Sequence, residues 1–202
     1  MSAEHQEGIE TKLPTVIALY AKGEAERLQI SPIFRGINVP HGDGQHVVVI
    51  PGLSESDSDM CFLIEFLSNI GYVPETSGMG FNLGWPYQHE LSRRKVHEVI
   101  QRFGKVSIIG HSLGGHNAAQ IAQTEHGVEK VIALGAPFLN GMSLDGTALM
   151  ESIYSPSDGV VKNFMSQFRG PHSKNVEVLD PNHFELLCNT TTFNEIGIAL
   201  AS

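Results

Sequence analysis

Short runs of β-branched residues alternate with longer segments of helical periodicity along most of this 202-residue chain. Parallel strands need crossover connections of helical length, so the alternation predicts an α/β fold in which helices cover both faces of a parallel sheet. We expect a compact sheet of about six strands, right-handed crossovers and a single domain over residues 1–202. The predicted strands are 46–50, 72–76, 105–109, 129–135, 152–155 and 175–179, and the predicted helices are 14–28, 62–70, 86–103, 117–123, 160–168 and 191–201.

Three segments allow more detailed predictions. The apolar repeat in helix 86–103 predicts a core face made of Leu91, Val96, Val99, Ile100 and Phe103. Residues 77–85 predict a glycine-rich loop with bulky apolar side chains. Residues 1–40 are expected to form an accessory helix and loop beside a core that covers residues 42–202.

Composition limits the kinds of protein that the chain can be. Hydrophobic residues make up 41% and charged residues 17%, as in globular proteins. A net charge of -9 repels phosphate backbones, so we expect no nucleic-acid partner. Cys61 and Cys188 lie in apolar helical runs without metal-ligand spacing, which predicts buried free thiols. No signal-peptide pattern or membrane-spanning run is visible, so a cytoplasmic location is expected, although a processed secreted form would look the same.

Residues 105–116 combine a β-branched run, the sequence Gly-x-Ser-x-Gly and the start of a helix. That pentapeptide would occur by chance in roughly one chain in ten of this size, so its context is what makes it informative. A strand, a sharp turn and a helix with serine at the apex predict a nucleophile elbow. Gly110 and Gly114 fit it because a Cβ at either place would clash with a neighbouring strand or helix. Ser112 is therefore the predicted nucleophile, in a strained backbone at a strand end.

A serine hydroxyl needs a nearby base, and the base needs an acid to orient it. Among the ten histidines, His183 follows the last predicted strand and is the candidate base. His111, inside the motif, is expected to point away from Ser112 and to pack beneath the turn. Asp158 follows another strand and is the candidate acid, although it could simply cap the next helix. Asp145 is the alternative acid, but no strand precedes it.

A serine nucleophile also needs donors for the oxyanion of a tetrahedral intermediate. The backbone N–H of Leu113, next to the serine, is one candidate. The turn Pro51-Gly52-Leu53 after the first strand supplies the N–H of Leu53 as the second, unless it is an ordinary turn. Because the carboxyl ends of parallel strands meet at one edge, these groups can converge although they are far apart in sequence.

Four stretches resemble segments of lipases and esterases of the α/β-hydrolase superfamily, and small lid-less bacterial lipases most of all. They are Val47-Val48-Val49-Ile50-Pro51-Gly52-Leu53, Gly110-His111-Ser112-Leu113-Gly114-Gly115, residues 152–161 and residues 182–187. Pro51 stands where those enzymes usually have histidine. The order Ser112, Asp158, His183 is also that of the superfamily. The resemblance covers about residues 42–202.

The resemblance implies hydrolysis of carboxylic esters or lipids through an acyl-enzyme, without a metal or an organic cofactor. The short connection before Asp158 leaves no room for a large lid, so we expect an open site for short- or medium-chain esters. Candidate residues for the acyl groove, each equally able to be plain packing, are Phe81, Leu83, Trp85, Phe138, Leu139, Met142 and Phe184. Two alternatives stay open: a hydrolase-like scaffold that binds a ligand without turnover, and thioesterase, acyltransferase or peptidase chemistry on the same site.

Overall fold

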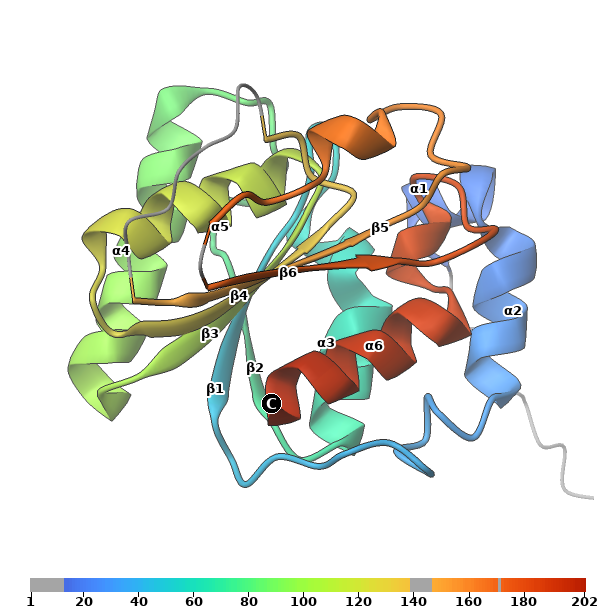
Figure 1. Ribbon diagram of the computed structural model, residues 1–202, viewed down its shortest axis with the longest axis horizontal. Helices are drawn as coiled ribbons and strands as arrows, with labels where there is room; N and C mark the ends of the chain where they lie inside the picture. Colours follow the sequence, from blue (N-terminus) through green and yellow to red (C-terminus); the bar gives the residue numbers. More distant parts are fainter. Residues whose placement is uncertain (1–12, 139–146, 171) are drawn as a thin grey trace, which may run out of the picture.

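Six strands form one parallel sheet in the order β2-β1-β3-β4-β5-β6 in the computed structural model, which describes residues 13–138, 147–170 and 172–202 (Figure 1). Every neighbouring pair of strands is parallel, so the predicted α/β architecture is confirmed. The strands are β1 His46–Ile50, β2 Val73–Thr76, β3 Val106–His111, β4 Val128–Leu134, β5 Leu149–Tyr154 and β6 Ser173–Glu177.

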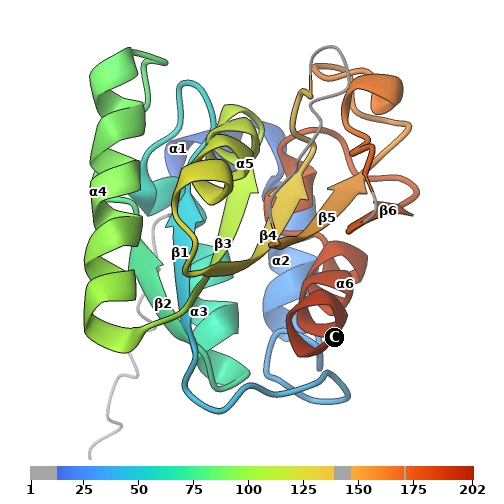
Figure 2. The same cartoon turned by 60° about the vertical axis from the view of Figure 1, so that its left-hand side comes forward.

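Helices cover both faces of the sheet, because its central strands are apolar on both sides (Figures 1 and 2). In β1, Val47 and Val49 join one hydrophobic cluster, whereas Val48 and Ile50 join the other. The first cluster takes side chains from α1 Thr15–Tyr20, α2 Lys22–Ile30, α3 Cys61–Asn69 and α6 Thr190–Ala201. The second takes them from α4 Pro86–Phe103 and α5 Leu113–Thr124. Within the described ranges, no helix has both the length and the hydropathy needed to cross a bilayer.

Several local predictions are confirmed with small changes. Residues 14–28 form two helices rather than one, because the chain bends at Ala21, and Ile17 of the first helix is fully buried. Asn189 caps α6 by accepting hydrogen bonds from two N–H groups of its first turn. Both cysteines are free thiols; Cys188 is buried and Cys61 is half-buried. The 3₁₀ turns η1 and η3 span Asp57–Met60 and Glu185–Leu187.

Helix α4 has the predicted bounds, with Pro86 at its first position. Its predicted core face is only partly right: Val96 is buried, but Leu91 and Phe103 are exposed. The first turns of α4 instead bury Gln88 and Ser92, and the side chain of Gln88 bonds to the backbone of loop 77–85. At the other end, Phe103 stacks on His46 with ring centroids 3.7 Å apart. Contacts with loop 77–85 and with His46 thus decide which side chains are buried at the two ends of the helix, and the apolar repeat does not predict these contacts.

The predicted helix at 160–168 is wrong, because the segment contains only one 3₁₀ turn, η2 Asn163–Met165. Its backbone groups bond to distant partners. The carbonyl oxygen of Met165 accepts from the Phe138 N–H at 2.6 Å, and the hydroxyl of Ser152 donates to the carbonyl oxygen of Ser166. In a helix over 160–168 the N–H of Phe168 would donate to the carbonyl oxygen of Phe164, but here it donates to Oδ1 of Asn175 at 2.8 Å, and the backbone of Lys162 is extended (φ -63°, ψ 135°).

The carboxyl ends of the strands lie along one edge of the sheet, where loops from distant parts of the sequence meet. The loops after β1, β3, β5 and β6 carry the residues that the sequence nominates for catalysis. Helix α5 begins at the same edge, directly after β3. The parallel topology therefore provides the convergence that the sequence predicts.

Candidate active site

Ser112 lies on the sharp turn between β3 and α5, in a conformation (φ 49°, ψ -123°) that non-glycine residues rarely adopt. A Cβ on Gly110 would lie 2.4 Å from the carbonyl carbon of Gly114. A Cβ on Gly114 would lie 2.3 Å from the carbonyl oxygen of Ile50. The predicted steric reason for both glycines is therefore confirmed. The turn presents half-buried Ser112 at the carboxyl edge of the sheet.

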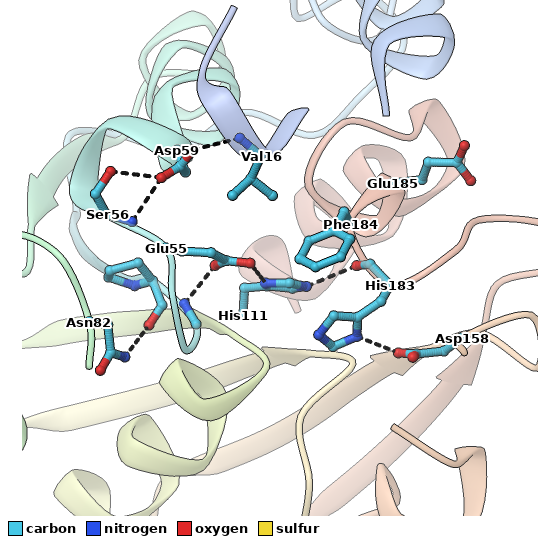
Figure 3. A network of polar contacts seen from close by, with 12 residues as sticks. Val16, Glu55, Ser56, Asp59, Asn82, His111, Asp158, His183, Phe184 and Glu185 are labelled. Atoms are coloured by element: carbon cyan, nitrogen blue, oxygen red, sulfur yellow. Dashed lines mark hydrogen bonds and ion pairs between the residues drawn. The ribbon is translucent and has the colours of Figure 1, made fainter. Parts of the chain in front are cut away.

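His183 and Asp158 come from the loops after β6 and β5, and the Nδ1–H of His183 donates to Oδ2 of Asp158 at 2.7 Å (Figure 3). Both side chains are buried. The other carboxylate oxygen of Asp158 accepts the N–H groups of Val160 and Val161, each at 2.8 Å. Asp158 therefore contacts the histidine and caps the following turn at the same time. Gly135 leaves space for the pair, since a Cβ there would lie 2.9 Å from Oδ2 of Asp158.

The surroundings of the two side chains set their protonation. Burial lowers the pKa of His183 below its ordinary value, and the hydrogen bond to Asp158 offsets only part of this effect. Burial alone would raise the pKa of Asp158, but the hydrogen bonds from His183 and the two N–H groups hold that pKa below its ordinary value. At neutral pH the pair is thus a neutral imidazole on a carboxylate, and Nε2 of His183 is the nitrogen that can accept a proton.

Two backbone donors lie close to Ser112, one from the turn after β1 and one at the start of α5. A Cβ on Gly52 would lie 2.9 Å from the Cβ of Ser112, so the turn touches the serine directly. The N–H groups of Leu53 and Leu113 donate to no other residue in the described part of the chain. Leu113 is the first residue of α5, where an N–H has no partner within the helix. Both groups are free to bind an oxyanion, and that role stays a prediction.

Ser112 and His183 lie at the same edge of the sheet, and the hydrogen bond that connects their segments is made by His111. Among the hydrogen bonds of the described residues, none links the Ser112 hydroxyl to His183. His111, which directly precedes Ser112, donates from Nε2 to the carbonyl oxygen of His183 at 2.9 Å. Hydrogen bonds between a nucleophile and its base are often long before substrate binds, so the arrangement is compatible with a Ser112–His183 pair.

Sequence reasoning missed the residue that holds His111 beneath the turn. Glu55, in the loop after β1, is 1% exposed, and its Oε1 lies 2.7 Å from Nδ1 of His111. Its Oε2 accepts the N–H of Gly52 at 2.6 Å. The available signal was a carboxylate two residues after the Pro51-Gly52-Leu53 turn, together with an ionisable residue inside the serine motif that needs a buried partner.

A cavity of about 250 Å³ lies beside Leu113, and of the candidate groove residues Trp85 lines it. Phe81 and Leu83 are exposed on the same loop, residues 77–85. The cavity has polar as well as apolar walls, which are formed by Asn82, Gly84, Pro86, His89, Asn117 and Gln120. Two larger hollows, of about 560 and 480 Å³, share none of these residues and lie at the amino ends of the strands.

The remaining candidate groove residues differ in position. Phe138 is buried and stacks on Phe168 with ring centroids 3.9 Å apart, so it belongs to the core beneath the site. Phe184 is half-buried and stacks on Tyr20. Outside the described residues lie Leu139, Met142 and the alternative acid Asp145.

Other histidines have structural partners instead of contacts with the serine. His116, one turn along α5, bonds the carbonyl oxygen of Pro137 at 3.1 Å, and His97 bonds Glu125 at 3.0 Å. Over residues 13–138, 147–170 and 172–202, no three His, Cys, Asp or Glu side chains gather as metal ligands would. His183 differs from these histidines because it contacts a buried carboxylate, that of Asp158. It also lies at the same edge of the sheet as Ser112, on a different loop.

Comparison with known proteins supports the fold. No family model matches the sequence. The structure is similar to a solved structure described with LipS and LipT, two metagenome-derived lipolytic enzymes, with a TM-score of 0.61 and 14% sequence identity. The match covers 80% of this chain and 95% of that chain. Together with the six-stranded parallel sheet, this likeness shows a compact α/β-hydrolase fold.

Proposed function

We propose that this chain is a serine hydrolase that cleaves carboxylic esters through an acyl-enzyme, with Ser112 as nucleophile, His183 as base and Asp158 as orienting acid. The observation that carries the proposal is the meeting, at one sheet edge, of a strained serine turn, a buried acid–histidine pair and two backbone N–H groups that have no partner among the described residues. The likeness in fold to a lipolytic enzyme supports the same reaction class by analogy.

In the first half-reaction, Oγ of Ser112 attacks the ester carbonyl carbon while Nε2 of His183 takes the hydroxyl proton. The carbonyl oxygen becomes an oxyanion, to which the N–H groups of Leu53 and Leu113 donate. The tetrahedral intermediate then collapses, the bond to the alcohol oxygen breaks, and His183 protonates the departing alkoxide. Asp158 holds Nδ1–H in place and stabilises the imidazolium that forms between these steps.

In the second half-reaction, water replaces the alcohol. Nε2 of His183 takes a proton from the water as it attacks the acyl carbon, and the same two N–H groups bind the new oxyanion. Collapse releases the carboxylic acid and returns the proton to Oγ of Ser112. Each half-reaction begins with neutral His183, which is the form that burial favours.

The cavity beside Leu113 bears on the size of the substrate. Its volume of about 250 Å³ lies just below the roughly 300–1,000 Å³ of most ligand pockets, which favours a short- or medium-chain group. The exposed side chains of Phe81, Leu83 and Trp85 offer apolar surface on the adjoining loop. We therefore expect soluble short- or medium-chain esters to be better substrates than long-chain lipids.

The test is covalent labelling together with a chain-length profile. We expect a fluorophosphonate probe to label Ser112, and p-nitrophenyl esters to be hydrolysed with a preference for short or medium acyl chains. Ser112→Ala should abolish labelling and lower kcat by at least about 10³-fold. Ser68→Ala, which changes an exposed serine of α3, is the matched control and should leave both unchanged.

Three further outcomes separate the alternatives. A folded wild-type protein that is neither labelled nor able to hydrolyse any ester would overturn the proposal and favour a binding scaffold. Faster turnover of the thioester than of the oxygen ester with the same acyl group would identify a thioesterase. Faster turnover of the matching amide would identify a peptidase.

A further inference from the structure

A second buried acid–histidine pair lies beneath the serine turn, and Figure 3 shows it joined through His183 to Asp158. Glu55 and His111 are each 1% exposed, with Oε1 and Nδ1 2.7 Å apart. The ester hydrolysis steps assign no role to either residue. Burying an ionisable pair is costly unless the geometry is good and the remaining polar atoms are bonded, so the function of this pair needs an explanation.

Every polar side-chain atom of the pair is bonded. Nε2 of His111 donates to the carbonyl oxygen of His183, and Oε2 of Glu55 accepts the N–H of Gly52. One proton is left between Oε1 of Glu55 and Nδ1 of His111, so the pair has no net charge. The charge and hydrogen bond of Glu55 raise the pKa of His111 despite its burial, which assigns this proton to the imidazole.

The pair contacts all three segments on which the proposed reaction depends. Through the N–H of Gly52, Glu55 closes the turn that carries the Leu53 donor, and its own N–H donates to the carbonyl oxygen of Gly52 at 3.2 Å. His111 is the residue before Ser112, on the last position of β3. Its Nε2 binds the backbone of His183 in the loop after β6. Segments from three separate strands are thus bonded through two side chains.

We propose that Glu55 and His111 are positioning residues, which fix the Leu53 donor and the backbone of His183 relative to Ser112. The proposal rests on the ester hydrolysis proposed above. Both side chains act through backbone groups of other residues, the N–H of Gly52 and the carbonyl of His183, and neither gives or takes a proton in the reaction.

Such a role is expected to affect kcat rather than KM. The oxyanion donor and the base act on the charge that develops in the transition state, whereas the ground-state ester makes few of these contacts. A displacement of about 1 Å in such a group can lower the rate about 10²-fold. A side chain at position 55 that is too short to bond both Gly52 and His111 should therefore slow turnover in molecules that remain folded.

Two substitutions of Glu55 separate the effect of side-chain length from the effect of charge. In Glu55→Gln, the amide oxygen can accept the Gly52 N–H, its NH₂ can donate to neutral His111, and Nε2–H of His111 can still donate to His183. In Glu55→Asp, the charge stays but the side chain is one methylene shorter, so it cannot reach both partners. We expect kcat within about threefold of wild type for Glu55→Gln and at least about tenfold lower for Glu55→Asp, with KM little changed in either.

Asp59 offers a matched control, because it is another buried carboxylate, four residues further along in the 3₁₀ turn η1 (Figure 3). It bonds the backbone and hydroxyl of Ser56 and the N–H of Val16, and none of its hydrogen bonds reaches the serine turn. Asp59→Ala should lower the urea midpoint of unfolding and leave kcat per active site within about twofold of wild type. It therefore reports what the loss of a purely structural carboxylate does to the assay.

Active sites are counted by titration with a fluorophosphonate, and kcat and KM are measured per titrated site. Misfolded molecules are not labelled and therefore do not lower the measured kcat. The order wild type, Glu55→Gln, then a much slower Glu55→Asp supports the proposal. Wild-type kcat in Glu55→Asp, or equal losses in Glu55→Gln and Glu55→Asp, overturns it. A wild-type protein that is neither labelled nor active is a different result, which overturns the ester hydrolase itself.

Discussion

Tyr20 of α1 stacks on Phe184, the residue after the proposed base, with ring centroids 4.8 Å apart and an interplanar angle of 24°. The side-chain amide of Asn182 also donates to the carbonyl oxygen of Tyr20 at 3.3 Å. Two contacts thus join the first helix to the loop that carries His183. Tyr20 is otherwise 57% exposed, so its position is explained by this loop rather than by the core.

Replacing Tyr20 by alanine should loosen the histidine loop. We expect the free energy of unfolding to fall by about 1 kcal/mol and kcat to fall a few-fold, because a stacked aromatic pair contributes about 0.5–1.5 kcal/mol. Urea unfolding and ester hydrolysis measure the two effects. Leu19→Ala, at a more exposed position on the same helix, is the control and should change neither. If Tyr20→Ala and Phe184→Ala have strictly additive effects on stability, the stack does not couple the helix to the loop.

Asp158→Asn should separate the two roles of this side chain. The asparagine carbonyl oxygen can still cap Val160 and Val161, but its NH₂ faces Nδ1 of His183 and selects the wrong tautomer. We expect kcat to fall by up to about 10⁴-fold, with a small change in the unfolding temperature. Steady-state kinetics and thermal unfolding of one preparation provide the measurement. Full activity in this variant would assign the orienting acid elsewhere.

The pH dependence of kcat/KM follows from the burial of His183. Only the neutral imidazole can accept the serine proton, so activity is lost as pH falls through the pKa of His183. Because burial lowers that pKa below the ordinary histidine value of about 6.5, the activity plateau should extend to lower pH than an exposed histidine would allow. A profile from about pH 4.5 to 8 measures the inflection. An inflection at or above 6.5 would contradict this assignment of the base.

Gly114→Ala should be among the most damaging single substitutions in the chain. The added Cβ would lie 2.3 Å from the carbonyl oxygen of Ile50, so β1 or α5 has to move. We expect a loss of about 1–3 kcal/mol or more in unfolding free energy. Gly23→Ala in α2, where nothing lies within 4 Å of the new Cβ, should instead stabilise the protein by up to about 1 kcal/mol. Urea midpoints in the reverse order would show that the serine turn is less constrained than its geometry indicates.

Local patterns in the sequence predict much of this fold and of the candidate site. Each of the six strands overlaps its predicted range, and α4 has the predicted bounds, since β-branched runs, Pro86 and Gly104 act over short distances. Ser112 and His183 follow from the same signals because residues at strand ends share an edge. Features that depend on neighbouring residues in the sequence are therefore predicted well.

The errors arise where distant partners decide the structure. Residues 160–168 have helical periodicity, but the Phe168 N–H donates to the side chain of Asn175 in β6, and the backbone of Lys162 is extended. Leu91 is exposed, whereas Gln88 of the same helix is buried where it bonds to the backbone of loop 77–85. The Glu55–His111 pair joins residues 56 positions apart, and no periodicity in either segment marks such a contact.

The order of strands in the sheet gives the proposed nucleophile, Ser112, and the proposed base, His183, unequal protection against unfolding. Strand β3, which leads to Ser112, pairs on both sides and is almost wholly buried, whereas β6, which leads to His183, is an edge strand with mostly exposed or half-buried residues. Edge elements with few buried contacts open locally at a lower free energy than the whole molecule unfolds. We therefore expect mild denaturant to open the loop that carries His183 while the serine turn stays folded, so that any ester hydrolysis by this chain is lost before the core unfolds.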